Sequence, residues 1–213
     1  DSGGYHLKSI DGMKGMKYDM CGAAGVLEAM ELLVRRGVRK NLIAVLALAE
    51  NVISPEAVKM GDVITTLAGK TVEIYNTDAE GRLALADGIT SAHKHGAHLV
   101  IDLATLTCSA QAALGDSFTG LFVNDGETCK QWEDAAGKTG EKFWRLPLDP
   151  SYHRQLEWSI CADFANYAPG KGGGACVAAC FLEKFLEEGT KWIHLDMVGP
   201  SVIRSETDEM AEG

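Results

Sequence analysis

The sequence predicts an α/β domain with a mixed, largely parallel central sheet flanked by helices. Continuous apolar runs at residues 41–49 and 97–103 have the composition of strands that are covered on both faces. Helical patterns at residues 21–37 and 83–95 precede these runs, and helices that alternate with buried strands require crossover connections. Residues 192–197 form a third run, which we expect to close the sheet as its last strand.

The remaining elements follow from local patterns. The first turns of the helix at 21–37 contain small residues, which permit close approach to a sheet, and a glycine ends it. Residues 62–66 and 71–75 alternate in polarity and predict a hairpin across the turn at 67–70. We also expect a strand at 118–124, a surface helix at 128–137, an apolar packing segment at 143–148 and a helix at 175–187.

Length and charge limit the possible partners. The 213 residues, 46% of them hydrophobic and 23% charged, are enough for one core, so we expect a single domain over residues 1–213. The net charge of −10 opposes binding to nucleic acid and to anionic lipid. The apolar run at 42–49 is far shorter than the ~18 residues that a membrane span needs. We therefore expect neither a nucleic-acid nor a membrane partner.

The six cysteines occur without a C-x-x-C pair, which suits neither a zinc ribbon nor a small disulfide framework. We expect reduced, mostly buried thiols and hence a reducing compartment, the cytoplasm. Cys176 and Cys180 lie four residues apart and are predicted to share one helix face.

Residues 76–83, with the sequence NTDAEGRL, concentrate charge at a strand-to-helix junction. In an extended or turning backbone, side chains two residues apart point to roughly the same side, so Asp78, Glu80 and Arg82 are predicted to face one cleft. Alternatively, Thr77 and Glu80 form a capping box for the helix that follows. The stretch by itself leaves both interpretations open.

Two further segments place a carboxylate beside glycines. Asp1 precedes Gly3 and Gly4, and Asp19 precedes the small-residue helix. Together with Asp78 and Glu80 they make four carboxylates, and hard divalent cations prefer such oxygen ligands. His6 is the only histidine in these segments, which argues against a histidine-rich zinc site.

These segments resemble a known family. Asp1-Ser2-Gly3-Gly4 with Lys8, Asp19 before Gly22, and the stretch 76–83 are similar in order and spacing to the signature of the leucine aminopeptidase (cytosol aminopeptidase) family, including its aminopeptidase B branch. The similarity runs over nearly the whole chain. It implies a metallopeptidase catalytic domain that hydrolyses N-terminal, leucine-like residues from peptides.

The resemblance also implies residue roles. Asp1, Asp19, Asp78 and Glu80 are expected to hold two divalent metal ions, Zn or Mn with Mg or Co as further options, with Asp1 and Glu80 bridging and the Asp78 main-chain carbonyl contributing. Lys8 and Arg82 are the implied catalytic pair, and Arg82 is expected to hold a bicarbonate ion as general base. The implied substrate-binding residues are Asp19, Met16, Asn76, Thr105 and Leu106.

For three of these positions the sequence also allows a structural role. Thr105 and Leu106 follow the strand at 97–103, where Thr107 could simply cap a helix. Met16 could line the pocket for the N-terminal side chain or pack in the core. Asp196 offers a possible fifth metal ligand, but the family gives the matching aspartate no such role.

The family pattern includes a lysine a few residues before Asp1, which ligates one metal through its amine. The sequence begins at Asp1, so either the full protein extends further or the metal shell is incomplete. Relatives are hexamers with an additional N-terminal domain, and we expect a homo-hexamer and such a domain here.

Two other functions stay open. A non-catalytic assembly subunit would keep the fold with an unloaded site, and the missing lysine is its only support. A dinuclear phosphoesterase would use the same metal chemistry on phosphoesters. The glycine-rich loop at 170–174 is not a phosphate loop, because the Walker spacing is absent, and His194 is predicted to be a hydrogen-bonded core residue.

Overall fold

The computed structural model describes residues 1–202, and its main sheet has four strands. In spatial order these are β3 (Leu99–Ala104), β7 (Lys191–Asp196), β4 (Thr119–Val123) and β5 (Phe143–Arg145). β3 and β7 pair in parallel, as do β4 and β5, whereas β4 and β7 are antiparallel. The predicted mixed, largely parallel sheet is confirmed.

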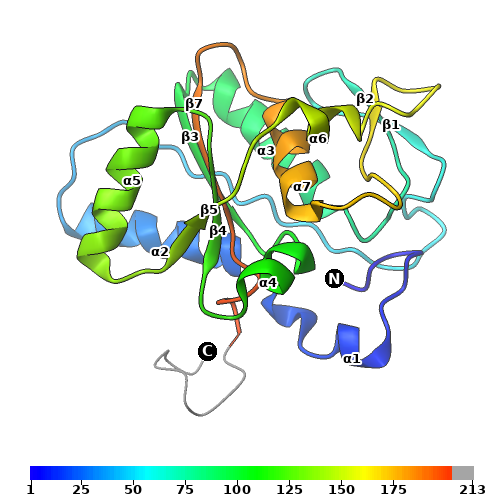
Figure 1. Cartoon of the computed structure of the whole chain (residues 1–213), viewed down its shortest axis with the longest axis horizontal. Coiled ribbons are helices and arrows are strands. Elements are labelled where there is room, and N and C mark those ends of the chain that lie inside the picture. Colours follow the sequence, from blue (N-terminus) through cyan, green and yellow to red (C-terminus); the bar gives the residue numbers. More distant parts are fainter. Residues whose placement is uncertain (203–213) are drawn as a thin grey trace.

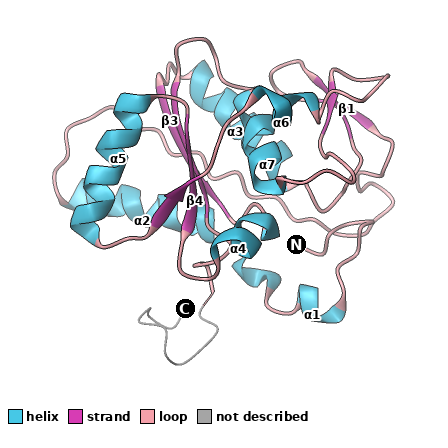
Figure 2. Cartoon of the chain, viewed as in Figure 1, coloured by secondary structure: helices cyan, strands magenta, loops and turns pink. Residues whose placement is uncertain are grey.

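Helices cover both faces of this sheet (Figures 1 and 2). α2 (Cys21–Arg35) and α5 (Gly126–Thr139) lie on one side. α3 (Gly81–Lys94), α4 (Cys108–Leu114), α6 (Pro150–Arg154) and α7 (Gly174–Glu183) lie on the other. Within residues 1–202, no helix has the length and apolar character that crossing a bilayer requires.

A second, smaller sheet supports the junction at residues 76–83. It contains β1 (Val63–Thr65), β2 (Thr71–Glu73) and β6 (Phe164–Ala165). β1 and β2 form the predicted hairpin, in which the Thr66 amide donates to the Lys70 carbonyl. β6, which the sequence patterns did not indicate, pairs in parallel with β2.

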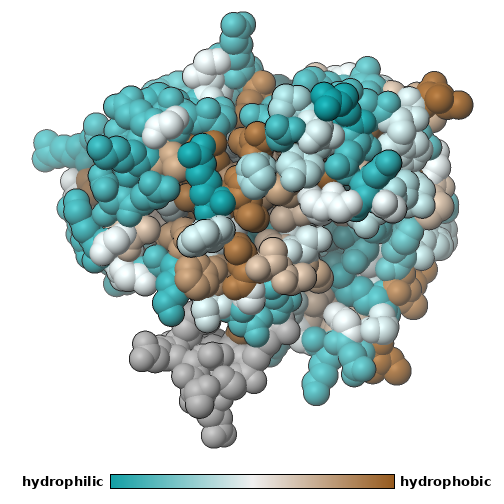
Figure 3. All heavy atoms as spheres, in the orientation of Figure 1, coloured by the Kyte–Doolittle hydropathy of each residue, from teal (hydrophilic) through white to brown (hydrophobic). Residues whose placement is uncertain are grey.

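The core lies mainly between the four-stranded sheet and α7. Residues 175–182 of this helix are all buried, including Cys176 and Cys180, and Phe181 packs edge-to-face against Phe164. A smaller cluster around Leu121 and Ile193 lies on the other face, beneath α5. On the face shown in Figure 3, hydrophobic side chains gather in a band over the sheet between two mainly hydrophilic flanks.

The prediction of an apolar packing segment at residues 143–148 is confirmed, because Phe143, Leu146 and Leu148 pack against the two core clusters. Residues 143–145 form strand β5 and pair in parallel with β4, for example Trp144 with Gly120. Three residues carry too little alternation to reveal a strand, so only the neighbouring strand defines it.

The predicted buried strand at residues 41–49 is wrong. These residues form no strand, most of their side chains are exposed, and the outer edge of β3 is unpaired within the described chain. The segment lies beside α3, where Val45 and Ala47 come within 3.7 Å of the position that a Cβ on Gly88 would take. A strand requires ladder hydrogen bonds with a neighbour, and residues 41–49 form none with the free edge of β3.

Candidate metal centre

Hydrogen bonds to Thr77 hold the first eight residues against the junction at residues 76–83. Its Oγ1 donates a hydrogen bond to the Gly3 carbonyl over 2.6 Å and accepts one from the His6 amide over 2.8 Å. Gly3 and Gly4 have φ values of +83° and +60°, a region that glycine enters without strain. The Thr77–Glu80 capping box is therefore wrong: Glu80 itself is the N-cap of α3 and makes no side-chain cap bond.

Asp19 lies near the junction at residues 76–83 because α2 begins against the end of β3. A Cβ added to Gly22 would lie 2.1 Å from the Leu103 carbonyl oxygen, so only glycine allows this approach. Asp19 precedes the helix, and its Oδ1 accepts a hydrogen bond from the Thr105 hydroxyl over 2.6 Å. The small residues at the start of α2 thus serve the predicted purpose.

The four predicted carboxylates and Lys8 converge. One carboxylate oxygen each from Asp1, Asp19 and Glu80 lies within 4.8 Å of the others. The Lys8 Nζ lies 2.9 Å from Asp1 Oδ2 and 2.5 Å from Asp78 Oδ1, and so joins Asp78 to the cluster.

Electrostatics show that this cluster fits a cation. Burial, with a further contribution from the charges of Asp19 and Asp78, raises the pKa of Glu80 to about 6. Glu80 Oε2 is buried and has no hydrogen-bond partner among residues 1–202. Several close carboxylates with an unsatisfied buried oxygen are the donor set that divalent cations bind. The residues therefore fit the divalent ions that the family resemblance implies.

Lys8 remains charged in this environment. Burial lowers its pKa, but the hydrogen bond and the charge of Asp78, with Glu80 and Asp19, outweigh burial and raise the pKa above the ordinary lysine value. A permanent ammonium therefore lies beside the carboxylates.

Arg82 is a buried residue in the first turn of α3 and is held by Asn166. Burial lowers its pKa to about 10, so the guanidinium remains charged at neutral pH. Its Nη1 donates to the Asn166 carbonyl over 2.9 Å, whereas its Nε finds no partner in the described residues. A buried guanidinium with an unused donor fits a small anion.

Sequence reasoning missed Asn166 and Asn51. The Asn166 side chain accepts hydrogen bonds from the amides of Tyr75 and Asn76 and donates to the Asn76 and Ala79 carbonyls. Asn51 Nδ2 donates to Asp1 Oδ1 and to the Thr77 carbonyl. The one signal for Asn166 in the sequence is a polar residue directly after the apolar pair Phe164-Ala165. Its complete burial is visible only in the structure.

Asp196 and Thr107 organise the turn after β3. Thr107 caps α4 through the Ala110 amide, as the structural alternative predicted. Its hydroxyl and amide also donate to Asp196, which accepts the Leu106 amide as well. Asp196 is buried and occupied by these contacts, so it supports the turn and leaves the Leu106 side chain at the cavity wall. His194 is, as predicted, a hydrogen-bonded core residue, because its Nδ1 lies 2.5 Å from the buried Asp102 Oδ1.

The predicted site residues line one cavity of about 1950 Å³, which also extends along residues 40–50 and β3. Asn76 helps to shape its wall, because its Oδ1 accepts the Asp78 amide. The predicted site residues on the wall are Asp1, Lys8, Met16, Asp19, Asn76, Asp78, Glu80, Arg82, Thr105 and Leu106.

An α/β domain with a carboxylate cluster beside a lysine and a buried arginine is suited to metal-dependent hydrolysis. The model of the cytosol aminopeptidase family, catalytic domain, matches residues 1–213. The chain belongs to this family.

Relatives and solved structures agree. The chain is 47% identical over 203 residues to a probable cytosol aminopeptidase of Blochmanniella floridana, covering 95% of this chain and 40% of that protein. It is 45% identical to one of Bacillus subtilis, covering 97% of this chain and 41% of the relative. The bottromycin maturation enzyme BotP in complex with Mn superimposes with a TM-score of 0.86 at 38% identity, over 95% of this chain and 45% of that one. The chain thus spans about 40% of the length of the curated relatives.

Proposed function

We propose that the whole protein is a metal-dependent aminopeptidase that removes N-terminal, leucine-like hydrophobic residues from peptides. The observation that carries this proposal is the convergence of Asp1, Asp19 and Glu80 within 4.8 Å beside Lys8. Two divalent ions, Zn or Mn with Mg or Co as options, would supply a water of near-neutral pKa and a polarised peptide carbonyl. Asp1, Asp19, Asp78 and Glu80 would hold them.

Lys8 supplies a fixed positive charge at this centre. Its raised pKa keeps the ammonium protonated throughout the neutral range. In our proposal it stabilises the negative charge that develops on the oxygen of the scissile carbonyl, because a positioned cation in a water-poor site stabilises such charge strongly. Its ion pairs with Asp1 and Asp78 hold it in place before substrate arrives.

Arg82 is the proposed site for bicarbonate, which would supply a general base when bound. The unused buried Nε and the rigid attachment of Nη1 to Asn166 support this assignment, since the guanidinium is oriented before an anion binds. Asn166 thereby acts as a positioning residue.

Substrate contacts follow from the cavity wall. Asp19 is proposed to accept the free α-ammonium of the substrate, with its carboxylate oriented by Thr105. Asn76, Leu106 and Met16 line the same cavity, and Met16 is proposed to contact the N-terminal side chain. A site that requires a free amine removes terminal residues and does not cut within a chain.

Hydrolysis of a leucine chromogenic amide by the full-length protein tests the proposal, before and after chelation and with Mn²⁺ or Zn²⁺ restored. We expect activity that disappears with chelator and returns with metal. Inactivity despite two bound metals per subunit would favour a non-catalytic assembly subunit. Hydrolysis of a phosphate ester but not of the amide would favour a phosphoesterase.

We further propose a cytoplasmic homo-hexamer with an additional N-terminal domain. Exposed apolar side chains such as Leu42, Ile43, Leu99 and Ile101 support a further covering element or subunit. Measurement of the molecular mass of the full-length protein in solution tests the hexamer.

A further inference from the structure

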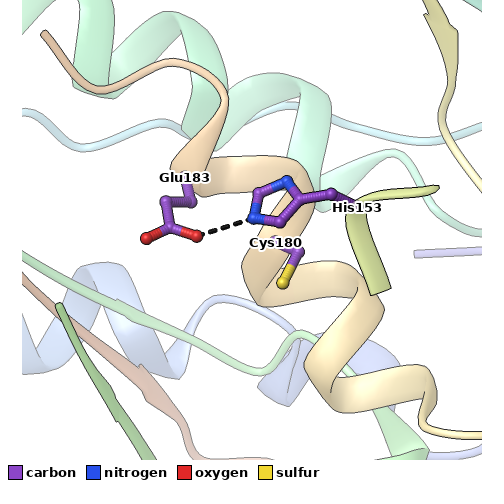
Figure 4. Close-up of side chains that lie close together, drawn as sticks. All are labelled: His153, Cys180 and Glu183. Carbon is purple, nitrogen blue, oxygen red and sulfur yellow. Dashed lines mark hydrogen bonds and ion pairs between the residues drawn. The ribbon is translucent and has the colours of Figure 1, made fainter. Parts of the chain in front are cut away.

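A second group of potential ligands lies between α6 and α7. His153 comes from α6, and Cys180 and Glu183 come from α7. Figure 4 shows the imidazole of His153 reaching across to α7, with Glu183 and Cys180 beside it. One ligand atom of each residue lies within 4.8 Å of the other two.

Local structure explains why the three residues meet. Cys180 and Glu183 are three apart on one helix, a spacing that places both side chains on the same face. α6 begins at Pro150 and is capped by Asp149, whose side chain accepts the Ser151 amide, and the short helix packs against α7. This packing brings His153 Nε2 to 2.8 Å from Glu183 Oε2.

We propose that His153, Cys180 and Glu183 form a zinc-binding site that is separate from the carboxylate centre. One sulfur, one imidazole nitrogen and one carboxylate oxygen are typical zinc ligands, whereas Mg²⁺ and Ca²⁺ prefer oxygen alone. Three protein ligands leave the fourth tetrahedral position to water. None of the three residues lines the cavity that contains the carboxylate centre.

The geometry requires only small adjustments. Zinc bonds of about 2.0–2.3 Å place tetrahedral ligand atoms roughly 3.3–3.8 Å apart. The limit of 4.8 Å exceeds this range by about 1 Å, and rotation of the His153 side chain can supply such a shift. The backbone that carries Cys180 and Glu183 belongs to a buried helix and need not move.

Solvent can deliver the ion. The side chains of His153 and Glu183 are 25% and 27% exposed, although Cys180 is fully buried. Glu183 also lines an open cavity of about 600 Å³ with Arg145 and Leu148. The site thus has a buried sulfur anchor and two ligands that water can reach.

A proton competes with zinc for the His153 imidazole. The adjacent Cys180 side chain, followed by the hydrogen bond with Glu183, raises the pKa of His153 to about 9, so the metal-free group is protonated at neutral pH. Zinc binding would displace this proton and the thiol proton, as is general for histidine and cysteine ligands.

Cobalt(II) tests the site, because a cobalt–thiolate bond gives a near-ultraviolet charge-transfer band. The full-length protein is first saturated with Mn²⁺, which occupies the carboxylate centre. The predicted ligands of that centre contain no sulfur, so the band reports only on a site with a thiolate. Titration with Co²⁺ should then produce the band with one equivalent per chain, and added Zn²⁺ should remove it.

Three variants separate the site from other thiols. Cys180→Ala should abolish the band, whereas Cys176→Ala, one turn earlier on the same buried helix face, should retain it. His153→Gln changes a partly exposed ligand and should weaken Co²⁺ binding at least about 100-fold, since loss of even an outer partner costs 10–100-fold. Absence of the band in the unmodified protein, its persistence in Cys180→Ala, or unchanged affinity in His153→Gln would each overturn the proposal.

Discussion

Gly22 is the residue at which α2 comes closest to the sheet, and Gly22→Ala should displace the helix from it. The new Cβ would lie 2.1 Å from the Leu103 carbonyl oxygen, and Cβ contacts essentially never fall below 3.0 Å. The difference, 3.0 − 2.1 = 0.9 Å, is the minimum shift. Because the obstacle is backbone, no side-chain rotation relieves it.

This shift should reach the metal centre directly. Asp19 lies three residues before Gly22 and contacts Thr105, which follows β3. Misplacement of a catalytic group by about 1 Å can lower the rate about 100-fold, so we expect a loss of this size in leucine-amide hydrolysis. Overpacking should also lower the free energy of unfolding by about 1–3 kcal/mol.

Gly25→Ala is the matched control. Gly25 lies on the same helix, but its added Cβ would meet only the Leu103 Cδ2 at 3.4 Å, an ordinary contact with a flexible side chain. Kinetics, Mn²⁺ affinity and thermal unfolding of both variants provide the assay. If Gly22→Ala matches Gly25→Ala in all three, the role assigned to this close approach is refuted.

Three further predictions concern the centre itself. Lys8→Ala should lower kcat about 100-fold or more with metal still bound, because it removes the charge that we propose stabilises the carbonyl oxygen; unchanged kcat with intact metal content would contradict this role. In metal-free protein, Glu80 has a folded-state pKa of about 6 against 4.5, so folding favours its protonated form and its contribution to stability falls as pH rises from about 4.5 to 6. Relative to Glu80→Gln, this loss should be on the order of 2 kcal/mol in denaturant titrations, and excess Mn²⁺ should reverse it. Asn166→Ala leaves several buried amides and carbonyls unpaired and should lower the free energy of unfolding by about 3 kcal/mol or more, measured by denaturant unfolding.

A flat difference between wild type and Glu80→Gln across this pH range would show that Glu80 titrates normally. Asn124 is a control for Asn166, because its side chain donates to the Thr190 carbonyl and accepts the Trp192 amide away from the centre. Asn124→Ala should therefore leave activity per folded molecule largely intact, and equal loss of activity in both variants would contradict the positioning role of Asn166.

Residues 76–83 show which features of the candidate site local sequence can predict. Their polarity and spacing predicted a strand-to-helix junction with Asp78, Glu80 and Arg82 facing one cleft, and all three line the same cavity. The capping box was an equally good local interpretation, yet Thr77 binds Gly3 and His6 instead. The choice depended on a segment more than seventy residues away.

Periodicity and composition determined the fold class, the helices α2, α3 and α5, and the long strands β3, β4 and β7, because these elements contain enough residues to show a pattern. Carboxylates beside glycines predicted the cation ligands of the candidate centre, and the family resemblance implied the roles of Lys8 and Arg82. Only the tertiary structure decided that residues 41–49 remain unpaired, that Asn166 orients Arg82, and that His153 meets Cys180. Such contacts join groups distant in the chain, and their energies depend on neighbours that no local pattern specifies.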